Sequence, residues 1–216
     1  MIISTKNTLF GKLFDSLGIN KSFHKYEPID IDSEASVISP VEARVAHIGE
    51  INQEGIITSK NNGIVNLRDL IGNYANHFSE GTYINFYLSP LNKHFWVTPC
   101  NGQFVYTQKN EGKSFFSAFV GLENMFGIEM FSKAVKKNAS ISSVLQAKDF
   151  MVAMIAVGSL NVNRIHVDYE EKKQYNAGVP CGYFSLGSSM LLCFPTSQEF
   201  LVKEGAPVKI GERIVK

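Results

Sequence analysis

The pair Gly187-Ser188 interrupts an aromatic and apolar stretch, GYFSLGSSMLLCFP, which spans residues 182–195. A Gly-Ser bond at a strained turn beside strands offers the groups that internal serinolysis needs. The serine hydroxyl would attack the preceding carbonyl, an ester would form, and β-elimination would leave a pyruvoyl group on the new N-terminus. Gly-Ser pairs are also common in ordinary turns. The pair alone therefore leaves both a reactive bond and a plain loop open.

Two further residues could exchange protons with a substrate. His94 stands among aromatic residues in YLSPLNKHFWVTPCNG, residues 87–102, and is either a proton donor on a catalytic strand or a buried core histidine. Glu42 follows a Ser-Pro pair in SPVEARV on a predicted strand. This carboxylate either acts as a base, orients one, or is a surface group at the end of the strand.

A fourth candidate is the stretch VGSLNVNRIHV, residues 157–167, which carries Arg164 and His166. An arginine and a histidine this close together suit an anion such as phosphate. The same two residues also suit a solvated strand, so the sequence leaves both interpretations open.

Bulk properties limit the classes of partner. The chain of 216 residues has 21 Lys and Arg, 20 Asp and Glu, a net charge of +1 and 44% hydrophobic residues. This composition predicts a globular domain and gives no electrostatic reason to expect nucleic acid. The three cysteines, Cys100, Cys181 and Cys193, form no C-x-x-C pair, so we expect free thiols and neither a metal site nor a disulfide framework.

The N-terminal region predicts a helix and a connector. Residues 8–19, TLFGKLFDSLGI, place leucines and phenylalanines on one helical stripe, and this helix either packs on the domain or lies on a membrane surface. No apolar run reaches the ~18 residues of a membrane span, and no signal peptide is recognisable. We expect a cytoplasmic protein, soluble or peripheral on the inner face of the membrane, with a helix and acidic connector in residues 1–36.

From residue 37 onward the sequence predicts a β-dominated α+β domain with a barrel- or sandwich-like antiparallel architecture, because β-branched and aromatic runs alternate with Asn-Gly and Pro. The Asn-Asn-Gly of residues 61–63 predicts a hairpin turn. Helical spacing appears in residues 67–78 and a helical turn in 131–145. Residues 150–167 suggest paired central strands, and residues 39–51 and 200–216 suggest two segments that face each other.

In order and spacing, several of these segments resemble the phosphatidylserine decarboxylase family. They are SPVEARVAHIGEI, the run from GIVNL to PCNG, MIAVGSLNVNRI, and GYFSLGSSMLLCFP followed by VKEGAPVKIGE. The resemblance extends from about Val37 to the C-terminus. It implies self-cleavage at a Gly-Ser bond, a pyruvoyl cofactor, and decarboxylation of phosphatidylserine to phosphatidylethanolamine. It also suggests a homodimer and a membrane-associating N-terminal helix.

The resemblance assigns roles to the candidate residues. Gly187 and Ser188 would flank the cleaved bond, and Ser188 would become the pyruvoyl group. His94 would act in decarboxylation. Glu42 would stand in for the aspartate that supports self-cleavage, because the early family motif Pro-Ala-Asp-Gly reads Pro40-Val41-Glu42-Ala43 here.

Other positions depart from the family pattern. The strand motif Pro-x-Asp-Tyr-His-x-x-His-x-Pro corresponds to residues 90–99, and its second histidine, a base for self-cleavage, is Val97 here. Valine carries no titratable proton. Pro180 occupies a position where a glutamate is usual, and Gly187-Ser188-Ser189 replaces Gly-Ser-Thr.

Three hypotheses remain at this point. The chain is a working pyruvoyl-dependent decarboxylase of phosphatidylserine or of a soluble amino acid. Alternatively, it is a non-processing, catalytically inactive family member that acts as a lipid- or amino-acid-binding or partner module. The third hypothesis is a β domain of unrelated function.

Overall fold

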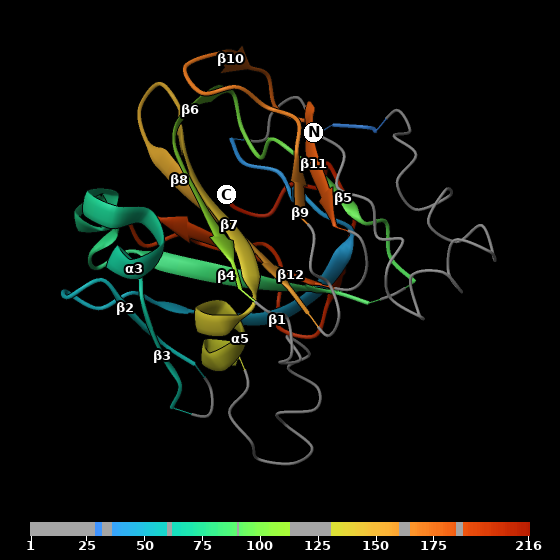
Figure 1. The fold of residues 1–216 in the computed structure, drawn as a ribbon. Helices are drawn as coiled ribbons and strands as arrows, with labels where there is room; N and C mark the ends of the chain where they lie inside the picture. Colours follow the sequence, from blue (N-terminus) through green and yellow to red (C-terminus); the bar gives the residue numbers. More distant parts are fainter. Residues whose placement is uncertain are drawn as a thin grey trace.

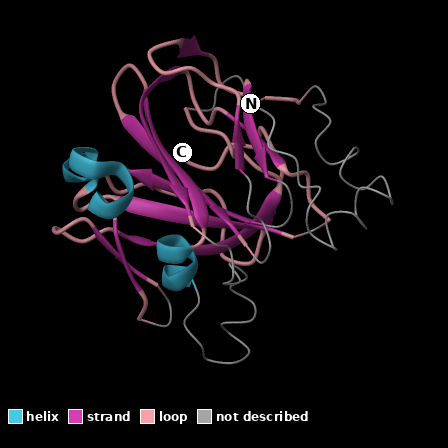
Figure 2. Cartoon of the chain, in the orientation of Figure 1, coloured by secondary structure: helices cyan, strands magenta, loops and turns pink. Residues whose placement is uncertain are grey.

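The computed structural model describes residues 29–31, 36–59, 62–89, 91–112, 131–159, 165–184 and 188–216. Strands dominate these ranges (Figures 1 and 2), as the β-branched and aromatic runs predict. The predicted helix at residues 8–19 lies outside the described residues. No helix within those ranges is long and apolar enough to cross a membrane.

A large sheet of eight strands forms the centre of the fold, in the order β10-β6-β7-β8-β12-β4-β1-β13. Every neighbouring pair in it is antiparallel. Its strands are β1 (Ala43–Glu50), β4 (Thr82–Leu88), β6 (Gly102–Glu111), β7 (Ala139–Gln146), β8 (Met151–Gly158), β10 (Gln174–Tyr175), β12 (Ser188–Phe194) and β13 (Pro207–Val208). The first and last strands in this order do not pair, so the described sheet is open and is not the closed barrel that we considered.

A small sheet packs on one face of the large one (Figure 1). It has the order β5-β11-β9, with β5 at Phe95–Val97, β11 at Pro180–Phe184 and β9 at Ile165–Val167. Trp96 and Phe184 from this sheet share one buried apolar cluster with Phe86 and Met190 of the large sheet. Burial of this shared cluster holds the two sheets together.

Helices and a hairpin cover the opposite face (Figure 1). These elements are α3 (Arg68–Ile71), the 3₁₀ helix η1 (Gly72–Phe78), α5 (Phe131–Lys137), β2 (Ile56–Thr58) and β3 (Ile64–Asn66). The helical segments predicted within residues 67–78 and 131–145 are confirmed, and so is the hairpin. Asn62 adopts a φ of 60° in the hairpin turn, which asparagine tolerates better than most residues. Gly72, with a φ of 56°, ends α3, and the chain continues as η1.

Two expectations about strand pairing had different outcomes. The segments 39–51 and 200–216 do face each other, since Ala43 of β1 pairs with Val208 of β13. Residues 150–167, by contrast, do not form two strands that pair with each other. β8 lies in the large sheet beside β12, whereas β9 pairs with β11 in the small sheet. An apolar run shows that its strands are buried, but the run does not identify their partners.

Candidate active site

Four adjacent strands of the large sheet lead to the small sheet at the same end. In this row Gly158, at the end of β8, pairs with Ser188, at the start of β12, and Ser188 pairs with Leu88, at the end of β4. Beside them Arg44, near the start of β1, pairs with Tyr87. These strand ends therefore lie side by side at one end of the large sheet. Ser188 is one of them, Glu42 directly precedes β1, and His94 follows β4 in the chain and directly precedes β5.

The segment before β1 runs along β5. The backbone N–H of Ile38 donates to the carbonyl of Pro99 at 2.9 Å, and that of Val97 donates to the carbonyl of Pro40 at 3.0 Å. Further along, the N–H of Lys93 donates to Glu42 Oε1 at 3.3 Å. Glu42 is half-buried and lies one residue before β1 rather than within a strand. Its carboxylate is thus placed beside the residue that precedes His94.

A turn after β4 binds the same carboxylate. The N–H and hydroxyl of Ser89 both donate to Asn92 Oδ1, at 2.9 and 2.8 Å. Asn92 Nδ2 in turn donates to Glu42 Oε1 at 3.2 Å. The sequence motifs assign no role to Ser89 or to Asn92, which stands where the family motif has an aspartate. A Ser-x-x-Asn spacing after a strand is a turn signal, but it does not reveal the distant carboxylate that the turn binds.

Ser188 is fully buried, with 0% of its surface exposed, at the first position of β12. Its Oγ is a buried hydroxyl to which the described part of the chain offers no hydrogen-bond partner. Leaving such a group unsatisfied costs roughly 1–3 kcal/mol, so its presence calls for an explanation such as a catalytic role. Gly158, the residue opposite Ser188 on the neighbouring strand β8, is held in turn by Asn138. The Nδ2 of Asn138 donates to the Gly158 carbonyl at 2.7 Å.

His94 is buried, with 2% of its surface exposed, immediately before β5. Its carbonyl accepts a hydrogen bond from the N–H of Phe184 at 2.7 Å, which continues the ladder between β5 and β11. Because side chains alternate along a strand, position 94 shares a face with Trp96, which packs toward the large sheet. This alternation places His94 on the inner face of the small sheet.

Val97 belongs to the opposite face of β5. Its fully buried side chain packs with Phe95, Ile38 and Ile210 in a separate apolar cluster. Its direct partner across the strands is Pro180 of β11. Two departures from the family pattern, at positions 97 and 180, are therefore neighbours in space.

His166, a further candidate, binds a partner outside this group. His166 Nε2 contacts Asp168 Oδ1 at 2.6 Å, and its ring lies 4.7 Å from that of Tyr183. Asp168 occupies a hydrogen-bonding position of the His166 ring, and its negative charge disfavours the binding of an anion there. Arg164 and Gly187 lie outside the described residues.

The three cysteines are poor nucleophiles in this fold. All are free and buried. Burial raises the pKa of the Cys100 thiol to about 12 and raises the pKa of the Cys193 thiol. Burial, followed by the charge of Asp168, raises the pKa of the Cys181 thiol well above its usual value. Since the thiolate is the reactive form, the serine is the better candidate.

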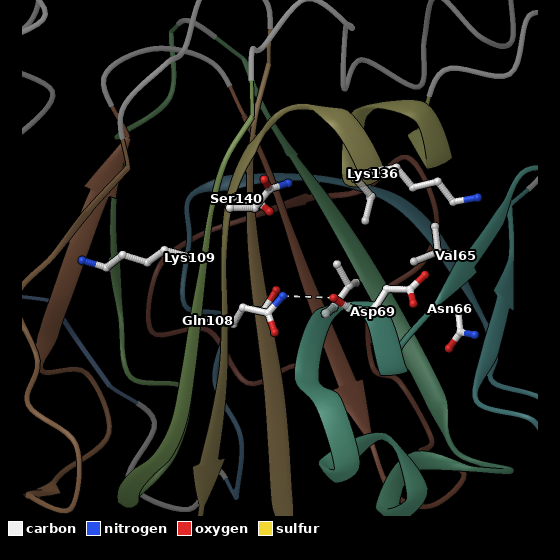
Figure 3. A pocket seen from close by; sticks show the side chains of 11 residues that line it. Val65, Asn66, Asp69, Gln108, Lys109, Lys136 and Ser140 are labelled. Carbon is white, nitrogen blue, oxygen red and sulfur yellow. Dashed lines mark hydrogen bonds between the residues drawn. The ribbon is translucent and has the colours of Figure 1, made fainter.

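A hollow of about 280 Å³ lies elsewhere, on the face covered by the helices (Figure 3). It is bordered by α3, α5, β3, β6 and β7, and its lining includes Asp69, Lys109, Lys136 and Ser140. Gln108 Nε2 donates to the Asp69 carbonyl at 3.0 Å across it. None of Ser188, His94 and Glu42 lines this hollow, so it is separate from the candidate site.

Comparison with known proteins identifies the family of the chain. The family model for phosphatidylserine decarboxylase matches residues 22–216. A phosphatidylserine decarboxylase proenzyme from Halalkalibacterium halodurans is 32% identical over 191 residues, which cover 87% of this chain and 70% of that protein. Another from Anoxybacillus flavithermus is 29% identical over 216 residues, covering 91% of this chain and 78% of that protein. The chain therefore belongs to the phosphatidylserine decarboxylase family.

Proposed function

We propose that this chain cleaves itself between Gly187 and Ser188 and then decarboxylates phosphatidylserine with the pyruvoyl group that results. One observation carries the proposal. Ser188 is a buried hydroxyl, unpaired among the described residues, at the end of the large sheet where the Glu42 segment and the loop to His94 also meet.

Self-cleavage needs only the chain's own groups and water. Ser188 Oγ attacks the Gly187 carbonyl carbon, the C–N bond breaks, and an ester joins residue 187 to the side chain of residue 188. Removal of the Ser188 Cα proton expels the new carboxylate of Gly187 and leaves a carbon–carbon double bond. Water then replaces the amino group, which leaves as ammonia. Residue 188 fits this chemistry because its hydroxyl is buried and is not bound to another described group.

Glu42 is our candidate base for the first step. In the family pattern a histidine does this work, and Val97 occupies its position. Both hydrogen bonds that Glu42 accepts from described residues reach Oε1, which leaves Oε2 to take the serine proton. A general base contributes about 10²- to 10⁴-fold in rate, and self-cleavage has to occur only once per molecule, so a slower base suffices.

The pyruvoyl group supplies an electron acceptor for the bond that breaks when the substrate carboxylate leaves as CO₂. His94 returns a proton to the carbon that lost CO₂. Its burial on the inner face of the small sheet supports this role, because a shielded imidazole protects the carbanionic carbon from unselective protonation by water.

Phosphatidylserine is the proposed substrate because the matched relatives are named phosphatidylserine decarboxylase proenzymes. A lipid substrate requires contact with a membrane surface, which residues 8–19 would provide from outside the catalytic domain of residues 37–216. A soluble amino acid is the alternative substrate. We also propose a homodimer, by analogy with the family.

A second candidate function is a non-processing family member that binds a lipid, an amino acid or a partner protein. The apolar pair of Val97 and Pro180 favours it, because this pair stands where the family pattern has titratable side chains.

A decarboxylation assay distinguishes these functions. Purified chain should release CO₂ from vesicles that contain phosphatidylserine, and Ser188→Ala should release none. Release from free serine alone would identify a soluble substrate. No release from either substrate would contradict the enzyme and favour the binding module.

A further inference from the structure

The hollow on the helix-covered face has a floor of polar residues from two neighbouring strands (Figure 3). Gln108 and Asn110 of β6 lie directly opposite Ser142 and Ser140 of β7. A sheet face that packs against helices is normally apolar, as Val144, the next residue of β7 on this face, is. The packing of helices on the sheet therefore does not account for this polar floor.

The two serine hydroxyls of the floor are buried and bind no described group. Ser140 and Ser142 are only 3% and 2% exposed. Neither side chain has a hydrogen-bond partner within the part of the chain that the structure describes. Buried polar groups normally have such a partner. Because both serines line the hollow, the partner that would satisfy their hydroxyls has to lie inside it.

Two asparagines of the lining each have one end of the amide left over. Asn110 Nδ2 donates to the Asn138 carbonyl at 3.2 Å, which leaves Asn110 Oδ1 as an acceptor. Asn66 Oδ1 accepts from the N–H of Arg68 at 2.9 Å, which leaves Asn66 Nδ2 as a donor. Together with the two hydroxyls, the lining offers both donors and acceptors. This mixture matches a ligand whose hydroxyl groups donate and accept in turn.

The charged residues of the lining disfavour an anion. Lys109 and Lys136 extend in opposite directions, away from Gln108 between them (Figure 3). The Asp69 carboxylate has no ion pair among the described residues, so it would repel a phosphate or a second carboxylate. The same carboxylate readily accepts hydrogen bonds from hydroxyl groups. A neutral ligand with several hydroxyls fits these charges.

The size of the hollow suits a small organic molecule. Its volume of about 280 Å³ far exceeds the roughly 10–15 Å³ that a single water needs. It lies just below the range of about 300–1,000 Å³ of typical ligand pockets. Three apolar side chains also line it and offer contacts to the carbon atoms of a ligand: Val65, Leu70 and Val135.

We propose that this hollow binds a small neutral polyol. The ligand's hydroxyls pair with Ser140, Ser142 and Asn110, and its carbon skeleton lies against the apolar side chains. The site is separate from Ser188 and His94, neither of which lines it. It therefore does not depend on the proposed function.

myo-Inositol is the probe that tests the site. Titrated into the full chain, it should shift the backbone amide NMR signals of β6 and β7 and reach saturation. The dissociation constant should be on the order of 1 mM, as expected of a ligand with about a dozen heavy atoms. Shifts that never saturate, or saturable shifts confined to the small sheet, would overturn the proposal.

Removing the serine hydroxyls should weaken this binding. Ser140→Ala/Ser142→Ala should raise the dissociation constant about 10-fold or more, and each single variant about 3-fold, because each loses one hydrogen bond. Thr58→Val is the matched control. Thr58 is exposed and does not line the hollow, so this variant should bind as wild type does. Equal dissociation constants in wild type and in the serine variants would contradict the site.

Inorganic phosphate tests the class of ligand. At the concentration at which myo-inositol saturates, phosphate should leave the amide signals of β6 and β7 unshifted. Saturable binding of phosphate there, without binding of myo-inositol, would refute the assignment to a neutral polyol. Neither titration depends on cleavage at Ser188, so a chain that never cleaves would contradict the proposed function and leave the polyol site to be decided by these measurements.

Discussion

Val97 in β5 lies directly opposite Pro180 in β11. Both residues depart from the family pattern, which has a histidine at position 97 and a glutamate at position 180. Val97 is fully buried in an apolar cluster with Phe95 and Ile210. A histidine at position 97 would bury a polar ring there, and a glutamate at position 180 would be the nearest group to bind it. The two departures therefore replace a pair of polar partners by a pair of apolar ones.

Restoring only one member of this polar pair should destabilise the fold. Val97→His should lower the free energy of unfolding by about 1–3 kcal/mol, because the imidazole loses its hydrogen bonds to water without gaining a partner. Val97→His/Pro180→Glu should lose less than the sum of the two single changes, since histidine and glutamate can bind each other across the strands. Urea unfolding of the four proteins measures the coupling.

The same double variant also tests what limits self-cleavage. If the missing histidine is the limit, Val97→His/Pro180→Glu should cleave up to about 10²-fold faster than wild type. A double variant that is folded, coupled and no faster would contradict the idea that the missing histidine limits self-cleavage.

His94→Ala should separate the two proposed reactions. His94 is assigned to protonation after CO₂ is lost, so the variant should cleave at close to the wild-type rate and lose about 10²- to 10⁴-fold in decarboxylation. Fragment mass measures the first effect and CO₂ release measures the second. A cleaved variant that decarboxylates at the wild-type rate would refute the role of His94.

Glu42→Gln tests the carboxylate as the base. The amide oxygen of glutamine can still accept from the N–H of Lys93 and from Asn92, so the turn should persist, whereas the ability to take a proton is lost. Self-cleavage of Glu42→Gln should slow about 10²- to 10⁴-fold. Self-cleavage of Glu42→Asp, which keeps a carboxylate, should slow less. Glu54→Gln, at an exposed position on the β2 side of the fold, is the control and should behave as wild type.

Raising the pH should destabilise the fold through its buried thiols. Burial raises the pKa of the Cys100 thiol to about 12 and also raises the pKa of the Cys193 thiol. Between the unfolded pKa, near 8.5, and the folded pKa, the native state keeps a proton that the unfolded state has released. Stability is therefore complete below about pH 8.5 and falls as the pH rises, by at most about 1.4 kcal/mol per thiol and pH unit.

Urea midpoints at pH 7.5 and pH 10 measure this effect. Cys193→Val removes one thiol at similar volume, so its midpoint should change less between the two pH values. An equal change in wild type and variant would show that Cys193 makes no contribution.

Local signals in the sequence predicted local structure well. The Asn-Asn-Gly turn and the helical spacing after Leu67 depend on neighbours within one turn of chain, and both are present in the fold. Residues 87–102, which we interpreted as either a catalytic or a buried strand, end β4, cross to β5 in the other sheet and return at β6. Alternating apolar residues look the same in either sheet, so a sequence pattern cannot assign them.

The candidate site could be proposed residue by residue but not as an arrangement. Ser188, His94 and Glu42 were proposed from their chemistry and from the order of the family motifs. The hydrogen bond from Asn92 to Glu42 and the pairing of Val97 with Pro180 depend on the register between segments that are far apart in the chain. That register is set by the packing of the two sheets, which no short motif encodes.

The most direct test of the proposed function is the intact mass of the purified chain, expressed without tags near residue 188. Cleavage between Gly187 and Ser188 predicts two fragments of roughly 187 and 29 residues out of 216, with a blocked N-terminus on the smaller one, and a single uncleaved product for Ser188→Ala. A wild-type chain that remains one species of 24.0 kDa after prolonged incubation would contradict self-processing.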